Sequence, residues 1–360
     1  MKKRIEWIDT VRAVTMFLVI VGHATYMKIS TDYGGVDYTM FGGHESISYK
    51  LLSMIVGIIY LFHMPLFMAV SGACFKFGFK KIENFTTLIQ SKFKRLIIPF
   101  LITSFLVAIP IKYISGFWCN STNIFEDILL GQFVFFNCVH LWFIVSLFEI
   151  FIVYYFIEKL NIKKGLLFWG ILIFLSWLGY FLGEKYNPFA ISSAIRNLIY
   201  FALGYNFISL IDEKISKWGL KQVLLLSITF VLIFFFYSLF GHFFKKDLIY
   251  KAFFYPYQTI MAVMGILLIV AVSMKIGKST LVLNCRVYKL FSQRSYELYL
   301  FSDPFNYLLL FLMFPKWGNT IYTDNEHSIL MFIITILGTT LAAVLLTWIY
   351  GKINKKELFT

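Results

Sequence analysis

Long apolar runs alternate with short polar, lysine-containing segments along almost the whole chain, and this pattern predicts membrane-spanning helices. A helix needs about 20 mostly apolar residues to cross the hydrocarbon core of a bilayer. About ten runs reach that length, at roughly residues 8–28, 51–75, 96–115, 140–158, 166–183, 194–211, 221–241, 255–274, 295–314 and 329–350. The segment 124–138 is too short and too polar to span, so we expect it to re-enter the membrane or lie along its surface.

The composition supports the prediction of membrane-spanning helices. Of the 360 residues, 59% are hydrophobic and 14% are charged, and a soluble protein of this length could not cover so much apolar surface. The net charge of +14 is typical of nucleic-acid binding, but here the basic residues lie in loops, as membrane topology requires. We predict an all-α polytopic membrane protein, a single domain over residues 1–360, with the lipid bilayer and no nucleic acid as partner.

The distribution of lysine and arginine gives the orientation. With the N-terminus inside, most of the 33 Lys and Arg residues fall in loops on the cytoplasmic side, which satisfies the positive-inside rule. The chain then has an even number of spans, cytoplasmic N- and C-termini, and a multi-pass position in the cell membrane. Asp9 and Arg12 interrupt the first apolar run, so we interpret it as a retained helix and not a cleaved signal peptide.

Two ionisable residues in the first span form the first candidate site. Arg12 and His23 are eleven residues apart, which returns a side chain to nearly the same face of an α-helix about 16 Å further along its axis. With Arg12 at the cytoplasmic surface, His23 lies near the bilayer midplane, where an ionisable group is a functional-site hypothesis by default. The alternative is an anchor helix in which His23 hydrogen-bonds a neighbour, and the spacing alone does not decide between them.

The second and fourth spans contain further candidates. His63 precedes Pro65, which kinks a helix, so His63 either caps the broken turn or lines a cavity. His140 and Trp142 mark the exterior start of the fourth span, where anchoring in the aromatic belt alone accounts for Trp142. Glu149 lies within that span, a costly position for a carboxylate unless it is paired or protonated.

Arg196 opens the sixth span on the outside, either as an interface cation or as a substrate contact. Glu297 and Asp303 both lie in the ninth span, just before Pro304. Two acids there favour a polar cavity, and the alternative is an acid that caps a proline-broken helix.

Lys92 and Arg95 follow the second span on the cytoplasmic side. On an α-helix, residues three apart share a face and can hold a phosphate group together, although positive-inside charge accounts for them equally well. The four cysteines lack metal-ligand spacing and the six histidines are scattered, so we predict no metal site. No complete nucleotide-binding or hydrolase motif is present.

The ordered motifs resemble the acyltransferase-3 family. They are the Arg12-x10-His23 spacing, Phe62-His63-Met64-Pro65 with Ser71-Gly72, and His140-Leu141-Trp142-Phe143. The resemblance extends from Trp7 to about Tyr307 and is nearest to the fucose 4-O-acetylase-like branch of integral-membrane O-acyltransferases. It implies acetyl-CoA as a cytoplasmic acyl donor and a sugar hydroxyl of a cell-surface or lipid-linked glycan as acceptor.

By the same resemblance, His23 matches the essential histidine of the family and Arg12 matches its basic partner. Lys92 and Arg95 occupy the positions of a frequent Arg-x-x-Arg pair. Lysine in the first position keeps the charge but loses bidentate geometry.

A second departure concerns the late Ser-x-x-x-Tyr-Leu motif, here Ser295 to Leu300. Family members often have a histidine three residues after the tyrosine, and this chain has Ser302 there, followed by Asp303. Asp303 is therefore the candidate replacement for that histidine.

We predict an O-acyltransferase, with His23 as general base or, alternatively, as an acyl relay. Arg12, Lys92 and Arg95 are predicted to bind the coenzyme A phosphates. His63, His140, Trp142, Glu149, Arg196, Glu297 and Asp303 are predicted to line the substrate cavity. The competing hypothesis is a proton-coupled transporter or flippase for a sugar or glycolipid, since several buried ionisable groups suit that function too.

Overall fold

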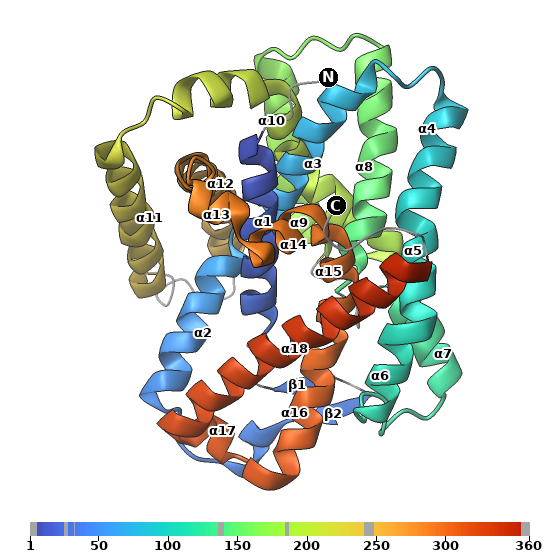
Figure 1. The fold of residues 1–360 in the computed structure, drawn as a ribbon, viewed down its shortest axis with the longest axis vertical. Coiled ribbons are helices and arrows are strands. Elements are labelled where there is room, and N and C mark those ends of the chain that lie inside the picture. Colours follow the sequence, from blue (N-terminus) through green and yellow to red (C-terminus); the bar gives the residue numbers. More distant parts are fainter. Residues whose placement is uncertain are drawn as a thin grey trace. The chain divides into compact units, whose positions relative to one another are not determined.

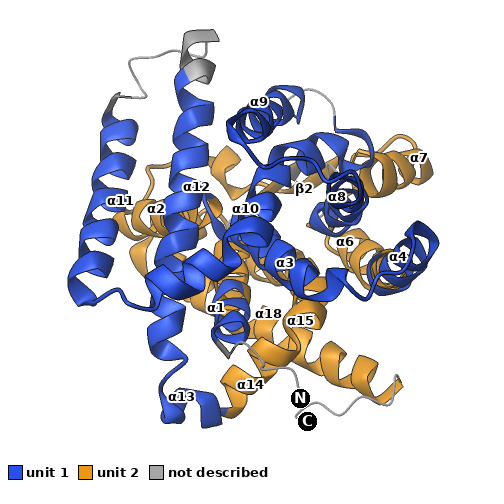
Figure 2. Ribbon diagram, turned by 90° about the horizontal axis from the view of Figure 1, so that it is seen from above, with its two compact units in different colours: residues 1–15, 61–96, 142–285 blue, residues 16–60, 97–141, 286–360 orange. Residues whose placement is uncertain are grey.

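The computed structural model describes residues 6–24, 28–31, 33–135, 140–183, 187–240 and 248–353. Within these ranges the regular structure is helical apart from one two-stranded hairpin (Figure 1). The chain divides into two compact units, each assembled from three stretches of sequence (Figure 2). Unit 1 contains residues 1–15, 61–96 and 142–285, and unit 2 contains residues 16–60, 97–141 and 286–360.

The prediction of an all-α polytopic membrane protein is confirmed. Eight helical segments in the described ranges are long and apolar enough to cross a membrane, and each coincides with a predicted span. The predicted first and fourth spans correspond to α1 (Glu6–His23) and α8 (Trp142–Lys159), which have 18 residues each. Each of these two helices contains three charged residues. The count of ten and the cytoplasmic termini stay predictions.

Unit 1 contains the first part of α1 and most of the long helices from the middle of the chain. Its other elements are α3 (His63–Phe79), α4 (Phe85–Lys92), α8, α9 (Leu166–Gly183), the 3₁₀ turn η5 (Pro188–Ala190), α10 (Ile191–Ile215), α11 (Leu220–Phe240), α12 (Leu248–Ile276) and α13 (Thr280–Asn284).

The core of unit 1 forms where α10 packs closely against α3. Gly72 of α3 and Gly204 of α10 allow the two backbones to approach, because a methyl group at Gly72 would lie 2.0 Å from the carbonyl oxygen of Phe201. At Gly204 it would lie 1.8 Å from the carbonyl oxygen of Ala69. Small residues at such contacts are typical of packed membrane helices. Gly72, part of the predicted motif, is therefore a packing residue.

Unit 2 contains the end of α1 and the C-terminal helices. Its other elements are β1 (Ile29–Thr31), β2 (Gly34–Val36), the 3₁₀ turn η1 (Tyr38–Phe41), α2 (Ile47–Tyr60), α5 (Ile98–Thr103), η3 (Ser104–Ala108), α6 (Ile109–Ile114), α7 (Ile124–Ile128), η4 (Leu129–Val134), α14 (Arg286–Gln293), α15 (Ser295–Ser302), α16 (Pro304–Trp317), α17 (Thr320–Thr323) and α18 (Asn325–Ile353).

Helix α18 organises unit 2 by packing against α15, α16 and α2. The hydroxyl of Thr335, in the middle of α18, donates a hydrogen bond of 2.9 Å to the carbonyl of Ala24. This bond fixes the end of α1 immediately after His23. The hairpin pairs Ile29 with Val36 in antiparallel register.

Within the described residues, three segments are π-helical, namely η2 (Phe93–Ile97), η3 and η4. Single π-helical turns of this kind occur frequently at functional sites. The segment predicted not to span, 124–138, is described up to residue 135 and forms α7 and η4. The amide of its Gln132, which is fully buried, donates a hydrogen bond of 3.1 Å to the Ser104 hydroxyl.

We predict that Gly72→Ala lowers the thermal stability of the protein in detergent by several degrees. The added methyl group meets backbone atoms that cannot move independently, and overpacking of this kind costs about 1–3 kcal/mol. Gly78→Ala in the same helix is the matched control, because a methyl group there meets nothing within 4 Å. Equal melting temperatures for the two variants would contradict the role of Gly72.

Candidate active site

Three polar side chains from separate spans meet inside unit 2. The carboxylate of Asp303 lies between two imidazole rings, with Oδ1 3.0 Å from Nδ1 of His23 and Oδ2 3.1 Å from Nδ1 of His140. Asp303 is fully buried, and the two histidines are each 6% exposed. A buried carboxylate costs free energy unless it is paired, and each oxygen of this carboxylate faces a ring nitrogen.

Local sequence explains why Asp303 faces inward. Pro304 occupies the first position of α16, and the backbone of Asp303 is helical, with φ −59° and ψ −41°. The Asp303 side chain makes no capping hydrogen bond. The alternative that this acid caps the proline-broken helix is therefore wrong. The two oxygens of its carboxylate contact the two histidines instead.

Tyr299 fixes the position of His140. Its hydroxyl donates a hydrogen bond to the His140 carbonyl, and the two rings meet edge to face with centroids 5.8 Å apart. The second ring nitrogen of His140, Nε2, lies 3.4 Å from the carbonyl oxygen of Leu300. That distance is long for a hydrogen bond, so the stronger polar contact of the ring is the one between Nδ1 and Asp303.

His23 is the last residue of α1, and its ring lies 5.9 Å from that of Tyr60 at the end of α2. Since Nδ1 faces Asp303, Nε2 is the ring nitrogen directed away from the carboxylate. A carboxylate that holds one nitrogen of an imidazole fixes the tautomer and stabilises the imidazolium when the other nitrogen takes a proton. The His23–Asp303 pair can therefore act as a general base.

The predicted phosphate ligands Arg12, Lys92 and Arg95 belong to unit 1. Arg12 pairs with Asp9 at 3.6 Å on the same helix. Cys74 of α3 lies within electrostatic range of both Arg12 and Lys92. The Lys92 ammonium lies 3.5 Å from the centroid of the Phe151 ring. The same ammonium lies 5.3 Å from the centroid of the Phe75 ring, so Lys92 lies beside α3.

Lys92 and Arg95 do not lie on one uniform α-helix, and their joint binding of a phosphate stays a prediction. Lys92 ends α4, and the π-helical segment η2 begins at the next residue. A π turn has a different pitch from an α turn, and Lys92 is half-buried whereas Arg95 is exposed. Arg95 still lies close enough to Lys92 to affect it electrostatically.

Several other candidates belong to unit 1. In unit 1, His63 is the buried first residue of α3. The Arg196 guanidinium lies 5.6 Å from the ring centroid of Trp142 and 5.0 Å from that of Tyr180. Among the described residues, no hydrogen-bond partner reaches the buried Oε2 of Glu149.

The second acid of the ninth span, Glu297, has a different partner. Its carboxylate lies 3.4 Å from the guanidinium of Arg294, three residues earlier in unit 2. Glu297 is therefore paired with Arg294, whereas Asp303 faces the two histidines, and a shared polar cavity stays a prediction.

Sequence reasoning missed Lys112 and Tyr299. Lys112 lies on α6 and is fully buried, near the end of the predicted span 96–115. The only available signal was a lysine at the edge of a long apolar run. Tyr299 belongs to the motif from Ser295 to Leu300, but nothing in the sequence indicates its contact with His140.

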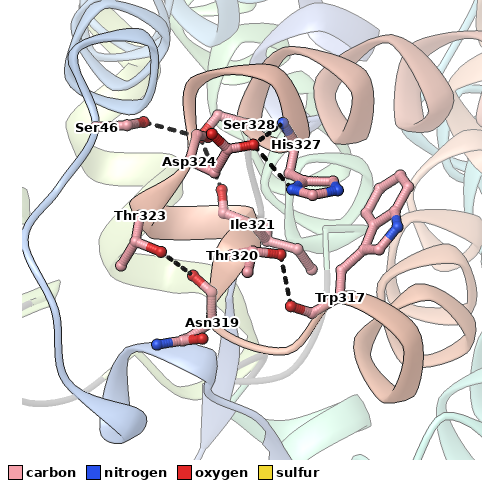
Figure 3. Close-up of polar contacts among 9 residues, drawn as sticks. All are labelled: Ser46, Trp317, Asn319, Thr320, Ile321, Thr323, Asp324, His327 and Ser328. Carbon is pink, nitrogen blue, oxygen red and sulfur yellow. Dashed lines mark hydrogen bonds and ion pairs between the residues drawn. The ribbon is translucent and has the colours of Figure 1, made fainter.

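Unit 2 contains a second carboxylate–histidine pair, which provides a contrast. Asp324 Oδ2 lies 2.9 Å from Nδ1 of His327 and accepts the backbone N–H of the same residue at 3.2 Å (Figure 3). Their side chains are 46% and 37% exposed. This pair forms a solvated helix start, whereas Asp303 and its histidines are buried.

Among the described residues, no group of three or more His, Cys, Asp and Glu has the arrangement of a metal site. The two imidazoles instead direct their Nδ1 atoms at one carboxylate, which is the arrangement of a proton-transfer site.

Comparison with known proteins gives the family. Neither a curated protein nor a solved structure matches the chain. The family model of the acyltransferase-3 acyltransferase domain matches residues 5–348, which includes the His23–Asp303–His140 cluster and the cations of unit 1. The chain is therefore a multi-pass membrane protein of the acyltransferase-3 family.

Proposed function

We propose that this protein is an O-acetyltransferase that moves an acetyl group from cytoplasmic acetyl-CoA to a hydroxyl of a cell-surface or lipid-linked glycan. The observation that carries the proposal is the buried contact between His23 and Asp303 at 3.0 Å. It supplies the base that acyl transfer to a poorly acidic sugar hydroxyl requires. The fucose 4-O-acetylase-like branch is the proposed place within the family.

In the proposed reaction, His23 removes the proton from the acceptor hydroxyl as its oxygen attacks the thioester carbonyl. The tetrahedral intermediate then collapses with cleavage of the carbon–sulfur bond. His23 returns its proton to the departing thiolate, so the products are the acetylated glycan and coenzyme A. Asp303 stabilises the imidazolium that exists between these two proton transfers.

Helix α1 supports the proposed position of the donor. Arg12 and His23 lie on this one helix, and eleven residues of α-helix correspond to about 16 Å. The phosphates of coenzyme A suit the cations Arg12, Lys92 and Arg95, while its extended pantetheine arm reaches inward toward His23. The positive-inside distribution of charge supports donor entry from the cytoplasm.

The acceptor is proposed to approach from the outer side. Half-buried Arg196 lies beside the rings of Trp142 and Tyr180, near the start of α10. Aromatic rings and a guanidinium favour the apolar face and the polar groups of a sugar. This proposal gives these residues of unit 1 a role in acceptor binding.

The direct test is mass spectrometry of surface glycans from cells with and without this protein. The proposed function predicts a mass difference of one acetyl group per modified sugar. Identical glycans, combined with solute transport in reconstituted vesicles that does not consume acetyl-CoA, would instead support the transporter hypothesis.

His23→Ala and Asp303→Asn are each expected to lower kcat for glycan acetylation in membranes by about 10²–10⁴-fold. The first removes the base, and the second removes the charge that stabilises its protonated form. Asp324→Asn is the matched control, because it alters the exposed carboxylate–histidine pair (Figure 3). Full activity in a folded His23→Ala protein would refute this mechanism.

Arg95→Ala is expected to raise the KM for acetyl-CoA by about tenfold or more, because a charge-assisted bond to a phosphate contributes about 1.5–3 kcal/mol. The KM for the acceptor should change little. Lys94→Ala, at the exposed neighbouring position, is the control. An unchanged donor KM in the Arg95 variant would exclude Arg95 as a phosphate ligand.

The general-base role also predicts that no acetyl-enzyme forms. Purified protein incubated with radiolabelled acetyl-CoA, without acceptor, should retain no label after denaturation. Label that is present in the natural protein and absent from His23→Ala would establish the alternative in which His23 itself carries the acetyl group.

A further inference from the structure

Unit 2 contains a second group of polar and aromatic side chains, centred on Lys112. This lysine of α6 is fully buried, and its ammonium lies 5.0 Å from the ring centroids of both Phe117 and Tyr307. The two rings meet edge to face, with centroids 5.5 Å apart. A ring face attracts a cation but does not neutralise it, so the positive field of Lys112 acts on any group that comes beside these rings.

Helix α16 connects this group with the candidate active site. Its first turn follows Asp303 directly, and the N–H of Asn306 donates a hydrogen bond of 3.0 Å to the Asp303 carbonyl. Residues three and four apart on a helix share a face, and four residues advance about 6 Å along its axis. The Tyr307 ring, with the cation that lies over it, therefore follows the Asp303 carboxylate by one helical turn.

Two buried polar atoms in the same group of residues can bind a ligand. Asn306 is 2% exposed and Trp118 is 4% exposed. Within the described residues, no hydrogen-bond partner reaches Asn306 Oδ1 or Trp118 Nε1. The Trp118 ring meets the Phe117 ring edge to face, with centroids 5.1 Å apart. A buried donor or acceptor without a partner costs free energy, and a ligand that binds there removes this cost.

The hairpin of unit 2 holds the turn that carries Phe117 and Trp118. The N–H of Gly35 donates a hydrogen bond of 3.0 Å to the Gly116 carbonyl, and the Thr31 hydroxyl donates one of 3.4 Å to the Phe117 carbonyl. The N–H of Phe117 donates to the Lys112 carbonyl at 3.0 Å. Binding groups that are held in place in this way lose little conformational entropy when a ligand arrives.

We propose that these residues form an acceptor subsite for a sugar with an anionic substituent, either a carboxylate or a phosphate. This inference rests on the proposed function and names the class of its acceptor. The Lys112 ammonium and the Trp118 N–H supply a charge and a donor for the anion. Asn306 Oδ1 accepts a hydrogen bond from a sugar hydroxyl, and the rings of Phe117 and Tyr307 cover the apolar face of the sugar.

The subsite positions the acceptor for the proposed reaction. With its anionic group at Lys112, one sugar ring extends along the first turn of α16 and directs a hydroxyl toward the His23 base. The predicted orientation puts the end of the span 96–115 toward the outer side, from which the acceptor comes. A sugar without the anion leaves the Trp118 donor without a partner, and sites of this kind discriminate strongly against such analogues.

The first test measures binding without turnover. The purified protein in detergent is titrated with methyl β-glucuronide, glucose 6-phosphate and methyl β-glucoside, and the rise in melting temperature gives each affinity. At least one of the two anionic sugars should bind about tenfold or more tightly than the neutral one. The stronger of the two identifies the preferred anion. Equal binding of all three sugars, or no binding of either anionic sugar, would overturn the inference.

Variants then identify the groups that select the anion. Lys112→Met should weaken binding of the preferred anionic sugar about tenfold or more and leave binding of methyl β-glucoside unchanged, whereas Lys112→Arg should keep the preference. Trp118→Phe keeps an aromatic ring, loses the donor and should weaken the same preference, which decides the question if Lys112→Met does not fold. Lys50→Met, at an exposed lysine of unit 2, is the control. Full anion preference in folded Lys112→Met or Trp118→Phe protein would refute the subsite.

The glycans modified in cells separate this inference from the proposed function. Mass spectrometry should find the acetyl group on a sugar that carries a carboxylate or a phosphate. Acetyl groups confined to neutral sugars would overturn the subsite and leave the acetyltransferase proposal intact. Absence of acetyl transfer, combined with preserved preference for anionic sugars in the binding test, would refute the proposed function and support the anion subsite.

Discussion

The contact of one buried carboxylate with two imidazoles is the interaction on which the candidate site depends. Asp303 has no exposure to solvent, and a carboxylate in such surroundings must be paired. Its two partners come from the end of α1 and from the residues before α8. The requirement to pair this charge therefore brings together three spans that are far apart in the sequence. The Thr335 bond to Ala24, the Tyr299 bond to the His140 carbonyl and the proline that begins α16 all hold these partners in place.

Burial of this kind limits which chemistry the site can support. An imidazole with one nitrogen held by a carboxylate has a defined tautomer, and its other nitrogen is directed at a reacting group. The pair of Asp324 and His327 has a similar distance but is partly exposed to solvent (Figure 3). Screening by water makes such a surface pair weak. Depth in the protein, more than the distance between the atoms, distinguishes the two pairs.

Much of the fold and part of the site could be predicted from the sequence. Hydrophobic runs located the spans because bilayer thickness fixes their length, and Arg12 with His23 was recognisable from helical spacing. The partnership of Asp303 with His23 and His140 could not be predicted, since it joins residues up to 280 positions apart. Glu297 and Asp303 looked equivalent in the sequence, yet only Asp303 reaches the histidines. The burial of Lys112 could not be predicted, because charge alone does not distinguish a loop lysine from a buried one.

The π-helical segments change the direction of side chains along the helical stretch 85–114. Residues 93–97 and 104–108 depart from the α-helical repeat on either side of α5. Each departure changes the angular position of every later side chain relative to a uniform α-helix. A helical wheel drawn through residues 85–114 at a constant 3.6 residues per turn therefore assigns Lys112 to an incorrect direction. The burial of Lys112 therefore depends on the two wide turns as well as on its place in the sequence.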